Sequence, residues 1–493
     1  MKDQSRALDF NTLLQVANLV VAGLLVYALV ALEENEYLDH TTVVLGLVLC
    51  LQTLVALHLE RRRRDPFVIM LAFQTIFYFA FRIYTLAVYP YSVVFVRYPY
   101  GPDESSYALL FILSANVFLY AGLMLVRFRS NSAVSAEGWR ATSPTSVIVL
   151  LLIAILFAYF RGSYWTEDNV PRALNFLVSF LTPDITILMG VSYFLLYRRS
   201  LTGAFAFAIG AVILLDIIAH TLWGSRSAIV GFVQNCILVA LAVYGCIRAS
   251  RKFVVLGLLL LPFAVVTLVA TFTISSYNRI AKADAQTFDV MKSVAAAGES
   301  SADLLAGPAL DLLLPPIAAR AGFFDFSAEV IANREEYRSI LSPAAYGRSL
   351  VDNILTPGFD LFDQPKLSNA LQFTYRGWGK PSKREAQGDF YQSDQFGIYG
   401  EFYALFLWGS LPIMFLVALG LKAAYVRISD PVPYMCAIKR VIVLFTFVKL
   451  INSFGLDWIL GELIPLVAGI YLYSFFFASR RVDAPQAPAL GTS

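Results

Sequence analysis

The chain has 493 residues, of which 58% are hydrophobic and only 15% are charged, and its mean hydropathy is +0.65. A soluble globule cannot hide that much apolar surface, so the composition excludes an ordinary soluble protein and requires a lipid bilayer as the solvent. The net charge of +3 is spread over many basic clusters. This distribution indicates orientation in a membrane and argues against a nucleic-acid partner.

Apolar runs of about 20 residues recur from Leu13 almost to the C-terminus, each long enough as a helix to cross about 30 Å of hydrocarbon. The sequence therefore predicts an all-α polytopic membrane protein with about twelve transmembrane helices. The predicted spans are 12–32, 42–59, 67–89, 107–127, 146–161, 175–197, 202–223, 227–247, 253–275, 395–422, 438–455 and 461–479. The first apolar run lacks a small-residue cleavage site, so we expect it to be retained rather than removed as a signal peptide.

Basic clusters between the spans orient the chain, because cytoplasmic loops carry an excess of Lys and Arg. The clusters that fall on one side of the predicted helices are Arg61 to Arg64, Arg127 with Arg129, Arg198 with Arg199, Arg248 with Arg251 and Lys252, Lys422 with Arg427, and Arg480 with Arg481. That side is predicted to be cytoplasmic, and both termini lie on it. The long loop after the ninth span is then outside.

This loop divides the chain into helices one to nine in 1–275, a cap in 276–394, and helices ten to twelve with a short cytoplasmic tail in 395–493. We expect the cap to be mainly helical. Within it, 303–319 is apolar but too short and Pro-broken to cross, which is typical of a helix at the interface or over a cavity mouth. All cysteines lie in or beside predicted spans: Cys50, Cys236, Cys246 and Cys436. Packing rather than disulfide bonds must therefore hold the cap.

Motifs of soluble enzymes are absent, since the sequence has no Walker A loop, dinucleotide fingerprint, HExxH or CxxC pair. Three histidines cannot build several metal sites, and we expect neither a metal nor a cofactor. The informative residues are instead polar groups in predicted hydrocarbon, because an ionisable group there is costly and tends to face a cavity or a partner.

The first such group lies at the predicted outer junction of spans seven and eight. Asp216 and His220 are four residues apart and share a helix face. Arg226 follows in a Gly/Ser turn that can start the next helix. Arginine beside the backbone N–H groups of a helix N-terminus suits a phosphate or diphosphate. The alternative is an interfacial arginine that contacts lipid headgroups.

Further arginines lie toward the predicted outer side. Arg82, in the third span, either reaches outward to the interface or lines a cavity with Tyr78 and Tyr84. The others lie at outer helix ends or after the apolar part of the cap: Arg161, Arg279 and Arg320. Together with Arg226 they would form a basic outer chamber if the fold brings them together.

The end of the cap and the start of the tenth span combine acidic residues, tyrosines and glycines: Asp389, Tyr391, Asp394, Gly397, Tyr399, Gly400, Glu401, Tyr403 and Gly409. Glycines allow close helix packing, whereas Glu401 at the outer end of a membrane helix is costly unless a chamber solvates it. A carboxylate and tyrosines that face such a chamber suit sugar hydroxyls and the apolar face of a sugar. Glu401 is either catalytic or a structural partner of one of the arginines.

Three features of the chain resemble the bacterial O-antigen and oligosaccharide repeat-unit polymerases (Wzy-type), which are related to the O-antigen ligase superfamily. They are the turn Gly224-Ser225-Arg226-Ser227-Ala228 after a mid-chain span, the single large loop, and Gly400, Glu401 and Tyr403 followed by Gly409. The resemblance implies a GT-C-like, metal-independent, inverting glycosyltransferase in the bacterial inner membrane. Its substrates would be undecaprenyl-diphosphate-linked oligosaccharides, with the growing glycan transferred onto an incoming repeat unit at the periplasmic face. A chain-length regulator and a lipid-linked oligosaccharide flippase are its expected partners.

The resemblance assigns Arg226 to the diphosphate and marks Glu401 and Tyr403 as motif positions. A departing lipid diphosphate needs its charge stabilised, which arginines can do without a metal. Further candidates for contact with diphosphate or glycan are Arg82, Arg279, Arg320 and Tyr391. A general base near the acceptor hydroxyl would be Glu401, Asp394 or His220, in that order.

Three other classes of protein fit parts of this pattern. An O-antigen ligase shares the architecture and the arginines but transfers the finished glycan to lipid A core. A monosaccharide-transferring GT-C enzyme carries an acidic motif in a large first outer loop, whereas the corresponding loop here, Glu33 to His40, is very short. A flippase or transporter has a similar number of spans, but it usually lacks so large a cap, and the sequence has no clear inverted repeat of broken helices.

Overall fold

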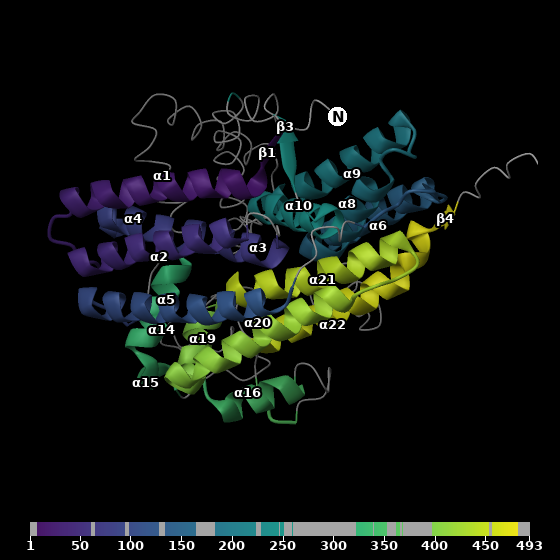
Figure 1. The fold of residues 1–493 in the computed structure, drawn as a ribbon. Helices are drawn as coiled ribbons and strands as arrows, with labels where there is room; N and C mark the ends of the chain where they lie inside the picture. The colour runs from purple at the N-terminus through teal and green to yellow at the C-terminus, as the bar shows by residue number, and fades with distance from the viewer. Residues whose placement is uncertain are drawn as a thin grey trace, which may run out of the picture.

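The computed structural model describes residues 7–60, 65–93, 98–127, 134–163, 183–222, 228–245, 247–250, 259, 322–338, 340–352, 361–364, 367, 397–452 and 456–481. This part of the chain is mostly helical, and its long helices run side by side in a layered bundle (Figure 1). The first group of helices is α1 (Phe10–Ala31), α2 (His40–Leu59), α3 (Pro66–Gln74), the π-helical turn η2 (Thr75–Ala80), α4 (Phe81–Val88), the 3-10 turn η3 (Pro90–Ser92) and α5 (Pro102–Leu125).

The second group is α6 (Pro144–Ser163), α8 (Pro183–Tyr197), α9 (Gly203–Leu222) and α10 (Ala228–Tyr244). Three short helices belong to the predicted cap: α14 (Phe323–Ala332), α15 (Arg334–Tyr337) and α16 (Pro343–Leu350). The last group is α19 (Gly397–Phe406), the 3-10 turn η5 (Leu407–Gly409), α20 (Ser410–Arg427), α21 (Pro433–Asn452), α22 (Leu456–Tyr473) and the 3-10 turn η6 (Ser474–Phe477).

Aspartate caps set the start of the first three helices. Asp9, Asp39 and Asp65 each accept a hydrogen bond from a backbone N–H in the first turn of the helix that follows. Such a bond satisfies one of the N–H groups that a helix N-terminus leaves without an intrahelical partner. In α3 the cap is followed by Pro66, whose fixed φ suits the first helical position and whose missing N–H costs nothing there.

Five helical stretches are long and apolar enough to cross a bilayer: α1, α2, the continuous α3–η2–α4, α5, and α19–η5–α20. They agree with the predicted spans at 12–32, 42–59, 67–89, 107–127 and 395–422. Helices also occur in the predicted spans between 146 and 247 and between 438 and 479, but most of their described apolar parts are shorter. Apart from residue 259, the predicted span at 253–275 lies outside the described residues. The total of twelve therefore stays a prediction.

Helix α21 lies inside the bundle although it carries three basic residues, Lys439, Arg440 and Lys449. Lys439 Nζ donates a hydrogen bond to Asp430 Oδ2 at 2.7 Å, in the loop before the helix. Burial opposes the ionisation of Asp430, but this bond and one from Val432 N outweigh it and hold the pKa of the carboxyl below its ordinary value. The guanidinium of Arg440 lies 5.6 Å from the ring centroid of Tyr425. Local partners thus offset the cost of these charges.

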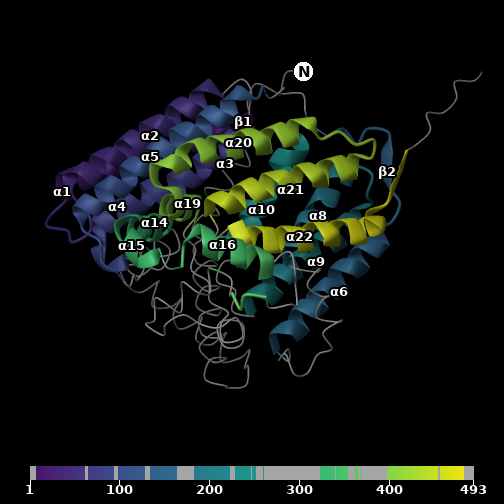
Figure 2. The same cartoon turned by 90° about the horizontal axis from the view of Figure 1, so that it is seen from below.

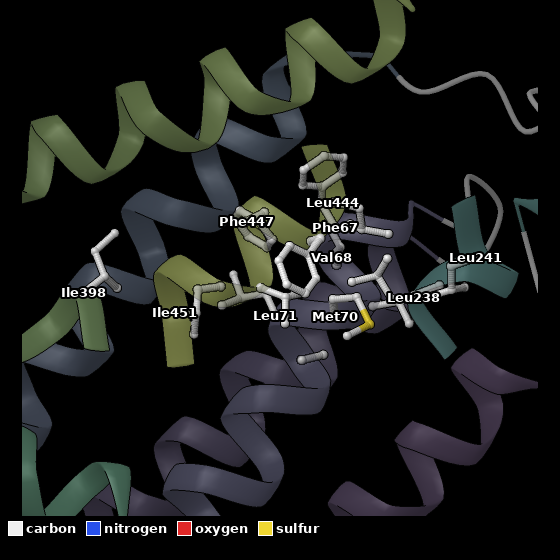
Figure 3. Close-up of a cluster of buried hydrophobic side chains, with 14 of the residues drawn as sticks. Phe67, Val68, Met70, Leu71, Leu238, Leu241, Ile398, Leu444, Phe447 and Ile451 are labelled. Carbon is white, nitrogen blue, oxygen red and sulfur yellow. The ribbon is translucent and has the colours of Figure 1, made fainter. Parts of the chain in front are cut away.

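Helix α3 occupies the centre of the hydrophobic core. Eight of its nine residues are buried. Figure 3 shows the labelled residues of α3, Phe67, Val68, Met70 and Leu71, between labelled residues of α10 and α21. The ring of Phe67 packs edge-on against Phe447 of α21 and Tyr425 of α20, with centroids 5.1 and 5.2 Å apart. A helix that is apolar on every side is buried on every side. The first half of the third span is therefore shielded from lipid by other helices.

The structure also contains two short strand pairs, which the all-α prediction did not include. Strand β1 (Ala7–Asp9) pairs antiparallel with β3 (Arg248–Ser250), and β2 (Trp139–Ala141) pairs antiparallel with β4 (Ser479–Arg481). In the register, Ala7 is opposite Ser250 and Trp139 is opposite Arg481. Each pair joins two segments that the basic clusters assign to the same side of the membrane. The pairing satisfies backbone N–H and C=O groups of segments outside the long helices. Hydropathy patterns do not reveal such pairing.

The cap helices α14 and α15 lie at the opposite end of the bundle from β2 and β4 (Figures 1 and 2). Helix α14 packs against α5, α19 and η2. Its residues Phe324, Asp325, Ala328 and Val330 are fully buried. The described helices of the cap therefore pack against the membrane helices. The apolar stretch 303–319 lies outside the described residues.

Helices α5 and α20 approach each other closely at Gly122. A Cβ atom built on Gly122 would lie 2.5 Å from the carbonyl oxygen of Phe415 and 3.2 Å from Cβ of Ala418. A backbone atom cannot yield as the end of a flexible side chain can. The close contact therefore requires glycine, in the way that small residues let membrane helices approach.

We expect Gly122→Ala to destabilise the protein by about 1–3 kcal/mol, because it overpacks a rigid contact. Gly420→Ala, on α20 where a new Cβ meets nothing within 4 Å, is the matched control. It should be neutral or stabilising by up to about 1 kcal/mol, since alanine favours the helix. The midpoints of thermal unfolding in the same detergent test this. Equal midpoints for the two variants would contradict the close approach of α5 and α20.

Candidate functional site

A buried ion pair joins the third membrane helix to the cap. Arg82 Nε donates to Asp325 Oδ1 at 2.9 Å, and Arg82 Nη2 donates to Asp325 Oδ2 at 2.6 Å. Both side chains are 0% exposed. The remaining donors reach Ser92 and Thr85: Nη2 bonds Ser92 O at 2.7 Å, while Nη1 bonds Ser92 Oγ at 3.0 Å and Thr85 Oγ1 at 3.3 Å. All three guanidinium nitrogens are engaged.

The backbone of the third span explains how Arg82 comes to face the cap. The π-helical turn η2 interrupts the α-helix directly before Phe81. Such a turn adds a residue without a full α-helical turn, so it rotates the residues that follow around the helix axis. The chain then leaves α4 at Tyr89 and returns in η3, where Ser92 folds back toward Arg82. The sequence predicted that Arg82 either reaches the membrane interface or lines a cavity. Neither prediction included a carboxylate partner, which the structure shows to be Asp325.

A second carboxylate of α14 fixes the loop before α5. Glu329 is fully buried, and its Oε1 accepts hydrogen bonds from Tyr98 N at 3.1 Å and from Tyr337 Oη at 2.6 Å. Asn333 Nδ2 donates to Pro99 O at 3.3 Å in the same loop. These bonds tie α14, α15 and the loop before α5 into one unit. Asp325 and Glu329, four residues apart on one helix, thus hold two different segments of the membrane domain.

Helix α19, which carries Glu401 and Tyr403, contacts this unit. It packs against α14, and Arg334 Nε of α15 donates to its carbonyl Ala404 O at 3.1 Å. Glu401 is only 2% exposed and Tyr403 only 5%. The helix starts at Gly397 with φ +62°, and a Cβ there would lie 2.6 Å from Ile451 O of α21. Only glycine fits both the dihedral angle and the contact.

Three aromatic side chains from neighbouring helical segments form a hydrogen-bonded set beside α19. Tyr403 Oη and Tyr107 Oη are 2.9 Å apart, and Trp408 Nε1 donates to Tyr107 Oη at 2.8 Å. Phe111 supports them, with its ring centroid 4.8 Å from that of Tyr403 and 5.4 Å from that of Trp408. Tyr107 is 40% exposed and Trp408 is 38% exposed. This aromatic set, Tyr107, Tyr403 and Trp408, therefore has one buried member and two that face outward.

Ionisable groups in the loops at this end have shifted pKa values. Burial, followed by the negative charge of Asp325, raises the pKa of Tyr100 well above its ordinary value, so its hydroxyl stays protonated. At Asp39 burial acts in the same direction. It is outweighed by hydrogen bonds from Thr42 and Ser106, which lower the pKa of the carboxyl. Neutral Tyr100 and ionised Asp39 are the forms expected at neutral pH.

Most of the predicted site residues cannot be placed relative to this region. Five of them lie outside the described residues: Arg226, Arg279, Arg320, Asp394 and Tyr391. Arg161 lies on α6, but its side chain lies outside the described part. His220 lies on α9, but its side chain also lies outside the described part. The convergence of the arginines into one chamber stays a prediction. Of the predicted residues, the structure brings Glu401, Tyr403 and Arg82 to one end of the bundle, on elements that contact α14 or lie next to it.

Asp216 lies among helices of the second group. It is buried on α9 and lines a cavity of about 10 Å³ with Leu151, Ile155, Ile187 and Val212. That volume is about the minimum that holds one water molecule. Within the described ranges, no group of three or more His, Cys, Asp or Glu side chains is arranged to hold a metal ion.

Comparison of the chain with models of known protein families, with curated proteins and with solved structures finds no match. Four features of the structure were not predicted from the sequence: Asp325, Glu329, Tyr107 and the ion pair of Asp65 with Lys422. The available signal was an acidic residue between apolar neighbours, as in Phe323-Phe324-Asp325, which predicts a buried charge without identifying its partner.

Substitution of Tyr337 tests how the cap is held. Tyr337→Phe removes a donor to buried Glu329, and we expect a loss of about 1–3 kcal/mol of stability. Tyr346→Phe is the matched control, because the Tyr346 hydroxyl is buried in the same cluster and has no hydrogen-bond partner in the described structure. This variant should be neutral or slightly stabilising. Thermal unfolding of both proteins checks the difference, and equal effects would refute the Glu329 contact.

Proposed function

We propose that the protein is a glycan polymerase of the bacterial inner membrane, with periplasmic chemistry on undecaprenyl-diphosphate-linked oligosaccharides. The growing glycan is transferred from its lipid diphosphate to a hydroxyl of an incoming lipid-linked repeat unit. The cap faces the periplasm, both termini are cytoplasmic, and the twelve-span GT-C-like architecture belongs to the same proposal. Arg226 contacts the diphosphate of the donor.

The observation that carries the proposal is the association of α19 with the cap. Glu401 and Tyr403, two motif positions of the resemblance, lie on a buried helix that packs against α14 and is bonded by Arg334 of α15. A polymerase of this type needs a carboxylate and sugar-binding groups at the junction of its membrane helices and its outer loop.

The aromatic set supports a carbohydrate substrate. Aromatic rings pack against the apolar face of a sugar, and hydroxyl and indole N–H groups bond its hydroxyls. Tyr107 and Trp408 expose their ring surfaces, while their polar atoms are held by each other and by Tyr403. In the proposed reaction, this surface holds the acceptor sugar beside α19. The base then takes the proton of the attacking hydroxyl as the lipid diphosphate leaves from the anomeric carbon.

Purified protein in nanodiscs, given a polyprenyl-diphosphate-linked repeat unit, should produce a ladder of glycans and release polyprenyl diphosphate. Arg226→Ala should reduce ladder formation by roughly 100-fold or more, because the leaving charge loses a preorganised donor. Arg338→Ala, at an exposed arginine of the cap, is the control and should retain activity. A wild-type protein that makes no ladder from its cognate lipid would refute the polymerase.

Two carboxamide variants test the base. Glu401→Gln or Asp394→Asn should lower kcat by roughly 10²- to 10⁴-fold if the altered residue is the base. The rise of the wild-type rate with pH should disappear in that variant, because the base acts only when deprotonated. Glu335→Gln, at an exposed carboxylate of α15, is the matched control. Full activity of both Glu401→Gln and Asp394→Asn would remove both residues from the role.

A further inference from the structure

We infer that Arg82 and Asp325 form a latch that positions α19, so Arg82 is a positioning residue and not a contact of the diphosphate. The catalytic part of this inference rests on the proposed function, but its structural part does not. Three observations support it: the donors of Arg82, the burial of α14 and the packing of α19.

The guanidinium of Arg82 has no nitrogen left for an anionic ligand in the described geometry. Its Nε and Nη2 grip the carboxylate of Asp325 in a bidentate pair, and Ser92 and Thr85 take the other bonds. Neither charged side chain is exposed at all. A diphosphate would have to displace Asp325 and leave that carboxylate buried without its cation, which is strongly unfavourable.

The latch acts on α19 through α14. Asp325 lies in the first turn of α14, a helix that packs on α19 and on η2. The ring of Phe323, two residues earlier, packs edge-on against Tyr78 of η2 with centroids 4.6 Å apart. Arg334 in α15, the helix that follows, bonds the carbonyl of Ala404 in α19. If the pair opens, α14 loses its charged anchor to α4, and α19 loses a fixed surface to pack against.

Removal of one charge and removal of both have opposite consequences for such a pair. One neutral partner leaves the other charge buried and unpaired, so the cap has to lift to solvate it. Two neutral partners can bond each other and leave no buried charge without a partner. Arg82→Gln and Asp325→Asn should therefore each open the latch, whereas the double variant should close it again.

Labelling of buried cysteines by a maleimide measures the opening on the full chain in nanodiscs. Three separate reporter proteins carry the substitutions Ala328→Cys in α14, Ala404→Cys in α19 and Ala437→Cys in α21, all at buried alanines. Each rate is corrected for that of the chain without the introduced thiol. We expect each single latch variant to label the α14 and α19 reporters roughly tenfold faster or more, with the rate of the α21 reporter unchanged. The double variant should return the α14 and α19 rates to within about threefold of the starting protein.

Ser92→Ala provides a gentler change if a latch variant does not fold. It removes the Oγ acceptor of Arg82 Nη1 and leaves the carbonyl of Ser92 in place. Labelling of the α14 and α19 reporters should rise about two- to fivefold, an effect of one neutral hydrogen bond. Unchanged labelling in Arg82→Gln, Asp325→Asn and Ser92→Ala would overturn the latch. Equal acceleration of all three reporters would show a general loss of stability, and it would overturn the positioning of α19.

The ladder assay separates positioning from direct contact. If Arg82 positions α19, the double variant regains activity together with slow labelling. If Arg82 binds the diphosphate, the double variant labels slowly but stays inactive, which overturns the positioning role. Failure of the wild-type protein to form a ladder would refute the proposed function alone, because the labelling rates of the three reporters would still decide the latch.

Discussion

The buried charge of Arg82 is the constraint on which the cap end of the structure depends. Burying an arginine costs several kcal/mol unless every donor is satisfied, and partners on α4 alone supply too few acceptors. The missing acceptors come from η3, through Ser92, and from α14, through Asp325. The third span and the cap, 243 positions apart along the chain, are therefore stable only together. A cap with no cysteine needs such a contact, because packing alone does not fix which surface α14 covers.

A second buried ion pair plays the corresponding part at the other end of the bundle. Asp65, the N-cap of α3, pairs with Lys422 of α20, and neither side chain is exposed beyond 1%. Lys422 Nζ also donates to Leu123 O near the end of α5. The central helix α3 is thus fixed to α20 and α5 where it begins, and its continuation α4 is fixed to the cap where it ends. Since dispersion contacts are similar for many registers of apolar helices, these few directional contacts select one register.

Hydropathy predicted the positions of the long helices well, because the signal of each helix is contained in one stretch of chain. Spans 12–32, 42–59 and 67–89 differ from the observed helices by a few residues. The strand pairs, the π turn before Arg82 and the carboxylate that meets it were not predictable in this way. Each depends on contacts between residues far apart in the sequence, and the pattern of a single sequence does not identify those partners. Glu401 and Tyr403 were singled out because a carboxylate at the outer end of a membrane helix is costly and because both match the resemblance. No charge or motif distinguishes Tyr107 and Trp408 from the other aromatic residues of the chain.

The break between α19 and α20 links the fold to the proposed chemistry. Leu407 has φ +51°, a conformation that costs a non-glycine residue about 1–3 kcal/mol and persists only when its surroundings fix it. The turn places Trp408 against Tyr107, and the hydrogen bond between them offsets part of that cost. A continuous helix would carry Trp408 on around its axis and separate it from Tyr403. The strained turn therefore holds the exposed rings of Tyr107 and Trp408 next to α19, the helix that carries the buried Glu401. Such a surface suits a ligand that has an apolar face and polar groups at its edge, as a sugar has. Contact with lipid would not require this arrangement.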